Sequence, residues 1–443
     1  MSKTKNDKTK NDKTKKVNKS ENVCTNHTEF SSETLLLHKG FDPALSVGSI
    51  ASPIYPNSTY VFPSAKAGER AFELAFFPEK AKKGEVGSLI YSRVNHPNAE
   101  IVEDRLVHIE PEGGAAATFG SGMSAISTTI LALLPRGKSV VYSNPIYGGT
   151  DFFLKENLTT LGCSSIEVET DNITKTKKVL QSCGDKLGML FIETPGNPTL
   201  VMTDIDEVAS FAKKINPNCL VMIDNTFMGI FQSPFKISPH VDIIVYSATK
   251  FMGGHAQMVA GATIVRKGKE HLIKDIKGWR TSLGTIASPF VCWELENSIK
   301  TYGIRMRGQS ARAEIVAQFL SKHKKISSVR YPSLLKASDS SYNIFKKQCS
   351  GPGSVITFDL LEDNREKTFK FLDDVASDHI ISLAVSLGGV ETLIEHPASM
   401  THSEVPESVR RKAKITEATV RLSVGLEDPN DLIKILDRAL SKL

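Results

Sequence analysis

The sequence contains no long apolar run. A membrane-spanning helix needs roughly 20 consecutive apolar residues, and the most apolar helical stretch, residues 126–134, is short and includes threonines. Of the 443 residues, 40% are hydrophobic and 23% are charged, which is typical of a soluble globular protein. We therefore expect no membrane segment, and the length predicts about two or three domains.

Cysteine pairs and clusters of metal ligands are also missing from the sequence. The six cysteines occur without any C-x-x-C spacing, and the eleven histidines are scattered. Disulfide frames and zinc sites need such regular spacing, so we predict neither a disulfide-linked fold nor a metal site. The cysteines are Cys24, Cys163, Cys183, Cys219, Cys292 and Cys349.

Excess positive charge is confined to the N-terminus. The net charge is +6, and residues 1–20 supply all of it because they contain eight lysines and two aspartates. We predict a disordered, lysine-rich tail over residues 1–33 and no nucleic-acid partner. This tail has no arginine and no apolar core, unlike a mitochondrial presequence or a secretory signal. We therefore expect a cytoplasmic protein.

Residues 34–97 predict an extended N-terminal arm. Within it, residues 50–63 contain three prolines and three aromatic side chains, so this stretch cannot be helical throughout. The arm has much apolar surface and no core of its own, which indicates that it lies on another subunit. The polar residues 79–87, rich in Lys and Gly, predict a surface loop.

Residues 98–298 alternate short, nearly continuous apolar strands with helices. This rhythm predicts a mostly parallel sheet with helices on both faces. Such doubly wound sheets bind ligands beyond the carboxyl ends of their strands. We predict strands at 115–119, 139–142, 165–168, 189–193, 220–224 and 241–246.

Residues 299–443 predict a smaller C-terminal α/β domain. A long helix over 289–312 leads into it, and strands follow at 354–359 and 419–424 with a helix at 365–376 between them. The closing helix has Asp428 as its N-cap and proline in its first turn, two strong start signals.

Lys250 follows directly on a buried strand, within Ser247-Ala-Thr249-Lys250. A desolvated lysine has a lowered pKa and attacks carbonyl groups. The pattern favours a Schiff base with pyridoxal phosphate, with the Ser247 and Thr249 hydroxyls turned toward the phosphate. The alternative is a lysine whose ammonium group reaches solvent from the strand end.

Three further features lie at predicted strand ends. The turn Gly120-Ser-Gly122-Met123 precedes a helix, so its N–H groups could hold a phosphate; a plain tight turn is the alternative. Asp224 could pair with a protonated pyridine nitrogen, or else cap the next turn. Tyr147 offers a flat face for a cofactor ring, or is an ordinary loop aromatic. Together with Lys250 they supply the parts that a pyridoxal-phosphate enzyme needs.

Arg421 lies within a strand and is flanked by apolar residues. A guanidinium group that faces inward there needs an anionic partner. The bidentate grip of arginine on a carboxylate would suit the α-carboxylate of an amino-acid substrate. The alternative is an arginine that faces solvent.

Eight motifs, in order along the chain, carry a resemblance to a known family. Through them the sequence resembles the pyridoxal-phosphate-dependent enzymes of Cys/Met metabolism, such as cystathionine γ-synthase, cystathionine γ-lyase, methionine γ-lyase and O-acylhomoserine sulfhydrylase. The resemblance extends from about residue 40 to the C-terminus. The motifs are Tyr91-Ser-Arg93, Ser121-Gly-Met123, Tyr147-Gly-Gly149, Glu193-Thr-Pro-Gly-Asn197-Pro-Thr199, Asp224-Asn-Thr226, Ser247-Ala-Thr-Lys250, Ser386-Leu-Gly-Gly-Val-Glu-Thr-Leu393 and Arg421-Leu-Ser-Val-Gly-Leu-Glu-Asp428.

The resemblance implies a fold-type I, aminotransferase-like subunit in a homotetramer built from two tight dimers that share their sites. Tyr91 and Arg93 would reach the phosphate of the neighbouring subunit's cofactor. Lys250 and Tyr147 would be catalytic, and Asn197, Ser386 and Arg421 would hold the substrate carboxylate region. The full cofactor set is Tyr91, Arg93, Gly122, Met123, Tyr147, Asp224, Ser247, Thr249 and Lys250.

The implied reaction is γ-elimination from a thioether amino acid, releasing a thiol, 2-oxobutanoate and ammonia. Val385 precedes Ser386, where relatives that handle cystathionine generally carry glutamate, and an apolar residue there favours methionine. The tract 395–402 is also similar to methionine γ-lyases. Against this, those lyases typically have cysteine at the position of Gly149 and a Lys-Asp pair at Arg280-Thr281.

Two alternatives stay open from the sequence. The first is γ-replacement on an activated homoserine, or cystathionine γ-lyase activity, with Val385, Gly149 and Arg280 around Lys250 deciding the substrate. The second is a binding or regulatory protein without turnover, against which the intact Tyr147, Asp224 and Lys250 argue.

Overall fold

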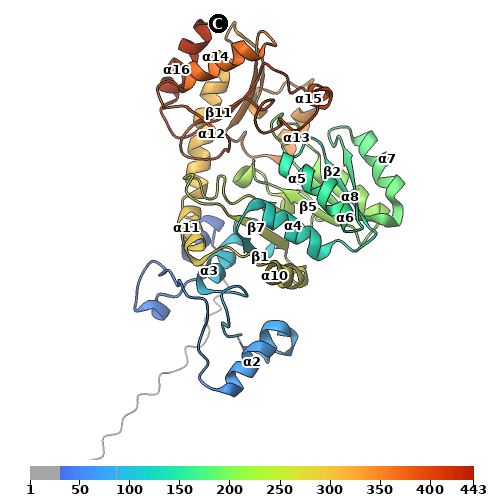
Figure 1. Ribbon diagram of the computed structural model, residues 1–443, viewed down its shortest axis with the longest axis vertical. Helices are drawn as coiled ribbons and strands as arrows, with labels where there is room; N and C mark the ends of the chain where they lie inside the picture. The colour runs from blue at the N-terminus through green and yellow to red at the C-terminus, as the bar shows by residue number, and fades with distance from the viewer. Residues whose placement is uncertain (1–29, 86) are drawn as a thin grey trace, which may run out of the picture.

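The computed structural model describes residues 30–85 and 87–443. Two sheets with their helices lie one above the other along the long axis, and the N-terminal segment extends below them (Figure 1). Residues 1–29 of the predicted tail, which include Cys24, lie outside the described residues. Among the residues described, no helix is both long and apolar enough to cross a membrane.

The larger sheet has seven strands in the order β1-β7-β6-β5-β4-β2-β3. Six of the strands run in the same direction, and only β7 runs in the opposite direction, antiparallel to β1 and β6. The pairs β2–β3, β2–β4, β4–β5 and β5–β6 are parallel. The mostly parallel sheet is therefore confirmed, although we did not predict β7. The strands are β1 (Gly113–Phe119), β2 (Ser139–Ser143), β3 (Ser164–Val168), β4 (Leu187–Glu193), β5 (Leu220–Asp224), β6 (Ile243–Tyr246) and β7 (Gly261–Arg266).

Helices cover both faces of this sheet because its strands are apolar on both sides. On β5, Val221 and Ile223 pack into one buried cluster, whereas Met222 packs into the cluster on the opposite face. Helices α3, α7, α8 and α11 contribute to the first cluster, and α4 and α10 contribute to the second. Their bounds are α3 (Pro97–Leu106), α4 (Gly122–Leu133), α7 (Ile173–Cys183), α8 (Ile205–Ile215), α10 (His271–Leu283) and α11 (Pro289–Ile299); the short α5 (Gly148–Phe152), α6 (Leu158–Thr160) and α9 (Pro234–Ile237) lie in connections.

The smaller sheet has the strand order β10-β11-β12-β9-β8 and a separate buried cluster. The closing helix begins as predicted, because the Asp428 side chain accepts a hydrogen bond from the Asn430 N–H group at 2.8 Å. The division at residue 298 stays a prediction. The elements are β8 (Ile326–Arg330), β9 (Val355–Leu360), β10 (Ser382–Leu383), β11 (Leu393–Glu395), β12 (Thr419–Ser423), α12 (Tyr302–Leu320), α13 (Ser340–Gln348), α14 (Arg365–Ala376), α15 (Glu407–Lys412) and α16 (Pro429–Ser441).

The single helix predicted over 289–312 is wrong, because the chain turns between α11 and α12. The helical bonding ends where the Thr301 N–H group donates to the Ser298 carbonyl, and α12 then runs upward to the small sheet (Figure 1). Arg305, in the first turns of α12, donates to the carbonyls of Phe251 and Met252 at 2.7 and 2.9 Å. The turn itself has no proline, and Gly303, which follows it in the first turn of α12, is a break signal that the prediction did not use.

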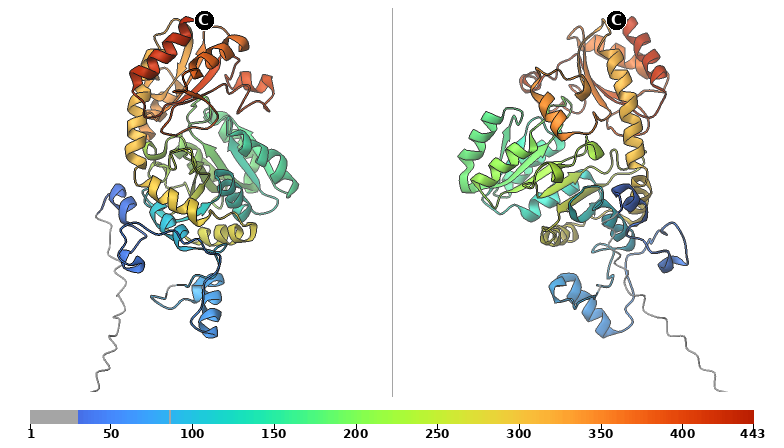
Figure 2. Two further views of the ribbon diagram at one scale, coloured as in Figure 1. Left: turned by 60° about the vertical axis from the view of Figure 1, so that its left-hand side comes forward. Right: turned by 180° about the vertical axis from the view of Figure 1, so that it is seen from behind.

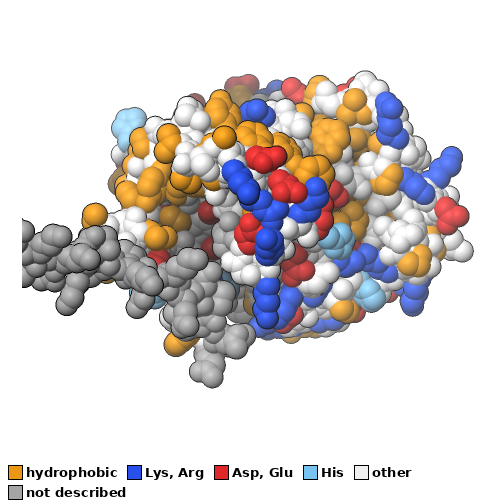
Figure 3. Space-filling model, turned by 90° about the horizontal axis from the view of Figure 1, so that it is seen from below, with side chains coloured by type: hydrophobic (Ala, Val, Ile, Leu, Met, Phe, Trp, Pro, Cys, Tyr) orange, Lys and Arg blue, Asp and Glu red, His pale blue; other side chains and the backbone are white. Residues whose placement is uncertain are grey.

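The N-terminal arm extends away from the body of the subunit (Figure 2). It contains α1 (Ser32–His38) and α2 (Ala65–Phe76), the latter a helix that we did not predict within the arm. Leu45, Val47 and Ile50 are almost fully exposed. Figure 3 shows hydrophobic side chains on the surface at this end of the molecule. Apolar surface of this kind in a folded chain marks an interaction face.

Candidate active site

A cavity of about 450 Å³ lies at the carboxyl ends of β4, β5 and β6, beside the N-terminus of α4 and against the smaller sheet. Eleven of the predicted site residues line it, and they come from segments that are far apart in the sequence. Parallel strands bring their carboxyl ends to one edge, which is why the predicted strand-end residues meet. They are Gly122, Met123, Tyr147, Asn197, Asp224, Ser247, Thr249, Lys250, Val385, Ser386 and Arg421.

Lys250 lies just beyond β6 and points at the small domain. Its Nζ donates a hydrogen bond to the Ser386 Oγ at 2.7 Å. Burial, and secondarily the positive charge of Arg421, lower the pKa of Lys250 to about 8. At that pKa the amine of Lys250 is substantially neutral near pH 8, and the neutral form is the one that attacks carbonyls. Its partner Ser386 has a φ of 103°, which is a strained conformation for a residue with a side chain.

The N-terminus of α4 packs tightly on the end of β6. Ser121 caps the helix by accepting from the Ser124 N–H group at 2.9 Å, and the first N–H groups of a helix have no intrahelical acceptor. A Cβ added at Gly122 would lie 2.8 Å from the Ser247 Cβ, so only glycine permits this approach. The Thr249 hydroxyl donates to the Ala260 carbonyl at 3.1 Å and accepts from the Ala260 N–H group at 3.0 Å.

Two buried carboxyl groups stand next to each other at the strand ends. Glu193 on β4 is the register partner of Asp224 on β5, and neither is more than 8% exposed. Burial raises the pKa of Asp224, although a hydrogen bond from Thr226 opposes the shift. Burial and the neighbouring Asp224 charge raise the pKa of Glu193 to about 8. The site therefore favours a cation beside these carboxyls.

Glu193 was not among the predicted site residues. Its two carboxyl oxygens accept from the N–H groups of Tyr147 and Asn197, each at 2.9 Å. One buried side chain thus fixes the backbone of two site residues. Its position at the end of an apolar strand, the signal that identified Asp224, could have identified it.

Arg421 faces inward and is 3% exposed. Its Nη1 lies 3.0 Å from the Glu395 Oε1 and 3.0 Å from the Asn197 Oδ1. Arg421 thus has an anionic partner within the protein, Glu395. This residue lies opposite Arg421 in the β11–β12 register, and we did not predict its role. The Nε of Arg421 and the Oε2 of Glu395 are buried without a partner among the described residues. The pair thus retains unused hydrogen-bonding capacity inside the site.

A buried polar network supports the strand ends from behind. Glu110 accepts hydrogen bonds from the Tyr246 hydroxyl and from the Asn225 Nδ2, the latter at 3.0 Å. Tyr246 precedes Ser247, and Asn225 follows Asp224. Burial raises the pKa of Glu110 to about 8, so the carboxyl is mostly neutral at pH 7. No motif in the sequence pointed to Glu110, because its partners are distant along the chain.

The profile for Cys/Met metabolism PLP-dependent enzymes matches residues 33–441. The chain belongs to this family. An L-methionine gamma-lyase of Fusobacterium nucleatum subsp. nucleatum is 36% identical over 397 residues, covering 89% of this chain and 94% of that protein. A cystathionine beta-lyase of Lactococcus lactis subsp. cremoris is 33% identical over 414 residues, covering 93% and 99%. The crystal structure of a cystathionine gamma synthase from Xanthomonas oryzae pv. oryzae, in complex with aminoacrylate and cysteine, has a TM-score of 0.82, 28% identity and coverage of 93% and 98%.

As a member of the Cys/Met metabolism family, the chain depends on pyridoxal phosphate, and its residues fit that group. The N-terminus of α4, which begins with Gly122, can bind a dianionic phosphate through its free N–H groups. A Cβ at Gly122 would collide with Ser247 at the end of β6. The buried pair Glu193 and Asp224 calls for a cation, which the protonated ring nitrogen supplies. Lys250 supplies an amine with a lowered pKa. The fold-type I architecture expected from the resemblance is confirmed by the solved relatives.

Three residues that the sequence analysis assigned to an active site do not line the cavity of their own chain: Arg280, Arg93 and Tyr91. Arg280 is completely buried and donates to Glu103 and to the Thr118 carbonyl, so the expectation that it lies around Lys250 is wrong: its charge is neutralised in the α3–α10 contact. Arg93 donates to the Thr281 carbonyl at 2.7 Å and lies 5.6 Å from the Tyr91 ring. Neither Arg93 nor Tyr91 lines the cavity.

Proposed function

We propose that this enzyme is a C–S lyase that carries out γ-elimination on methionine or a similar thioether amino acid. With the uptake of one water, the products are a thiol, 2-oxobutanoate and ammonia. The observation that carries the proposal is Val385, an apolar side chain beside Ser386 in the cavity lining. The distal ammonium group of cystathionine would lack a counter-charge beside Val385, whereas the methyl thioether of methionine needs none. The 36% identical L-methionine gamma-lyase supports this choice.

The proposed roles follow from the charges in the site. Arg421 and Asn197 bind the substrate α-carboxylate, and Ser386 holds the Lys250 amine close to it. When bound, pyridoxal phosphate supplies an electron sink for the negative charge that develops at Cα. Lys250, as a neutral amine, moves protons at Cα and Cβ, and Tyr147 gives a proton to the departing γ-sulfur.

We further propose that Asp224 faces the ring nitrogen, and that Gly122, Met123, Ser247 and Thr249 bind the phosphate. The supporting evidence is that each lines the same cavity. Negative charge from Asp224 would keep the ring nitrogen protonated, because an adjacent carboxylate favours the charged form of a base.

We also propose that Tyr91 and Arg93 complete the site of a neighbouring subunit, in a tetramer formed from two dimers. Two observations support this: both residues lie outside their own cavity, and they belong to an arm with exposed apolar side chains. The cytoplasmic location stays a prediction.

A second candidate is γ-replacement on an O-acylhomoserine. Gly149 favours it, because the cysteine that methionine γ-lyases typically carry there is absent. The solved cystathionine gamma synthase covers 93% of this chain.

The test is to incubate the purified holoenzyme with methionine, and separately with O-acyl-homoserine plus cysteine or sulfide. We expect 2-oxobutanoate and methanethiol from the first mixture. Product from the second mixture alone would reject γ-elimination on methionine, and turnover of neither would favour the cystathionine γ-lyase alternative. Lys250→Ala is the control and should abolish both the imine absorbance and turnover.

A further inference from the structure

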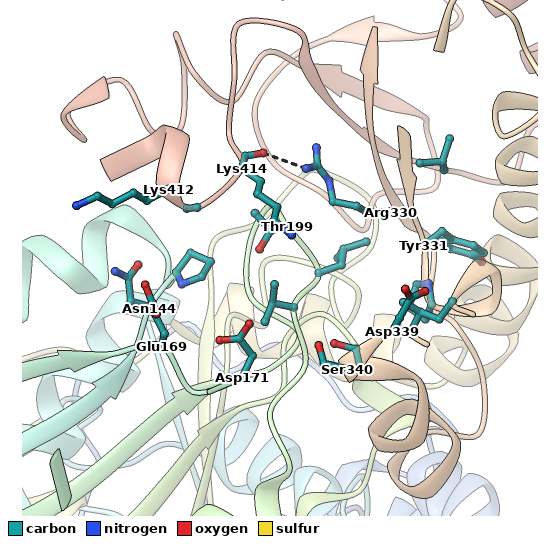
Figure 4. A pocket seen from close by; sticks show the side chains of 18 of the residues that line it. Asn144, Glu169, Asp171, Thr199, Arg330, Tyr331, Asp339, Ser340, Lys412 and Lys414 are labelled. Carbon is teal, nitrogen blue, oxygen red and sulfur yellow. Dashed lines mark hydrogen bonds between the residues drawn. The ribbon is translucent and has the colours of Figure 1, made fainter. Parts of the chain in front are cut away.

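A second cavity, of about 780 Å³, lies between the two sheets. Its floor is formed at the carboxyl ends of β2 and β3, and its roof by β8 and the chain that follows α15 (Figure 4). Carboxyl ends of parallel strands are where α/β sheets bind ligands. The active-site residues described above do not line this cavity.

The roof offers a place for an anion. The Lys414 side chain points into the cavity toward Thr199 (Figure 4), and it makes no ion pair among the described residues. Thr199 is only 5% exposed, and its Oγ1 has no hydrogen-bond partner in the part of the chain that the structure describes. A buried hydroxyl without a partner destabilises the fold. A ligand carboxylate between Lys414 and Thr199 would satisfy both groups.

Arg330 adds positive charge to the same roof. Its Nη2 is held by the Asp359 Oδ1 at 2.6 Å, and its Nη1 donates to the Lys414 carbonyl at 2.9 Å. These contacts fix the position of the Lys414 backbone. The Nε of Arg330 is buried without a partner among the described residues.

The floor offers a place for a cation. Asp171 and Glu169 line the cavity directly beyond β3, and the Asp171 carboxylate points up into it (Figure 4). Glu169 is paired with Lys175 at 2.8 Å, whereas Asp171 makes no ion pair within the described residues. Asp171 is therefore the carboxylate that is available to a ligand ammonium group.

Apolar side chains complete the cavity between these charged ends. They are Leu200, Val201, Leu334 and Leu335. We infer that the cavity between the sheets binds a small zwitterionic amino acid with an apolar side chain, its carboxylate at Lys414 and Thr199 and its ammonium group at Asp171. This site is separate from the catalytic cavity.

The occupant would lie against the wall that separates the two cavities. Pro145 and Thr199 line the second cavity, while Tyr147 and Asn197, two positions along the same segments, line the first. The two segments touch, because a Cβ added at Gly196 would lie 3.0 Å from the Pro145 carbonyl. An amino acid bound against this wall would therefore contact the two segments that carry the substrate-binding residues.

The test measures how much L-norleucine the holoenzyme binds in equilibrium dialysis. Norleucine has no γ-leaving group, so its binding does not depend on the proposed reaction. The change in cofactor absorbance counts the equivalents in the active site. We expect two equivalents per chain, only one of which changes the absorbance. Lys414→Ala and Asp171→Asn should each weaken the second equivalent at least about tenfold, the loss of one charge-assisted contact, and leave the first unchanged.

Lys412→Ala is the matched control, because Lys412 also lines the cavity but its side chain points away from Thr199 (Figure 4). It should retain both equivalents. A single equivalent in the wild type, or a second equivalent that persists in both Lys414→Ala and Asp171→Asn, would overturn the inference. Displacement by inorganic sulfate, with Asp171→Asn binding like the wild type, would also overturn it and indicate a simple anion site.

A kinetic readout tests the link between the cavities. With any thioether or activated homoserine that the enzyme turns over, norleucine should be a mixed inhibitor of the wild type and a competitive inhibitor of Lys414→Ala. Purely competitive inhibition of both proteins would show that the second cavity has no effect on catalysis, against the coupling inferred from the shared wall.

Discussion

Glu193 and Asp224 are adjacent carboxyl groups on neighbouring parallel strands, and both are buried. Burial raises the pKa of both carboxyl groups, and the neighbouring Asp224 charge raises that of Glu193 further. A cation placed beside them removes that cost. The protein is therefore organised to bind a positively charged group at the ends of β4 and β5.

The two carboxyls differ in what replacement should do. Asp224→Asn removes the charge that we assign to the ring nitrogen, so we expect kcat to fall by about 10²-fold or more, with weaker cofactor binding. Glu193→Gln keeps a side chain that can accept from the Tyr147 or Asn197 N–H group, so we expect a smaller loss that falls mainly on KM. Steady-state kinetics and cofactor titration measure both. Equal effects of the two variants would contradict the assignment.

Lys250 should make the stability of the cofactor-free protein depend on pH. Its pKa is about 8 in the folded state and 10.5 when unperturbed, so the unfolded state holds more protons between these values and stability rises with pH. Burial of the charged lysine therefore costs up to about 3 kcal/mol below pH 8. Lys250→Met should be more stable than the wild type by up to this amount at pH 7, and equally stable near pH 10.5, in urea unfolding. A difference that does not vary with pH would contradict the prediction.

Glu110 should matter for cofactor binding although it lies behind the site. Glu110→Ala leaves the buried Tyr246 hydroxyl without an acceptor, which costs about 1–3 kcal/mol, whereas the Asn225 Nδ2 keeps the Gly229 and Gln232 carbonyls as acceptors. We expect a lower free energy of unfolding and weaker cofactor binding. Glu110→Gln retains a carbonyl oxygen and should restore most of both. An alanine variant that binds cofactor like the wild type would show that the network does not position Asp224 and Ser247.

Gly149 should limit the position of the Tyr147 ring. A Cβ at Gly149 would lie 2.8 Å from the Tyr147 Cε1, so Gly149→Ala must displace the ring. We expect kcat/KM to fall about tenfold or more with little change in thermal stability, because the ring is 46% exposed and can move into solvent. Gly148→Ala is the matched control, since its Cβ would meet only the Thr401 carbonyl at 3.3 Å. Similar losses in both variants would point to a general effect on α5.

The sequence was informative where position along one strand decides the chemistry. Asp224 and Lys250 were predictable because each ends an apolar strand, and the ends of parallel strands converge. Glu395 and Glu110 were not predicted, because their roles depend on partners brought close only by tertiary packing. The turn between α11 and α12 was missed because the apolar pattern continues across it, and the single Gly303 beyond it is a residue that helices also tolerate.

Arg305 has a mechanical consequence for the lysine. Arg305 belongs to α12, the helix that leads into the smaller sheet. Its guanidinium group donates hydrogen bonds to the carbonyls of Phe251 and Met252, which directly follow Lys250. These two hydrogen bonds tie the first turns of α12 to the segment that follows Lys250, so a rotation of α12 would also shift that segment. The position of the amine therefore depends on the packing of the smaller sheet as well as on the strand that precedes Lys250.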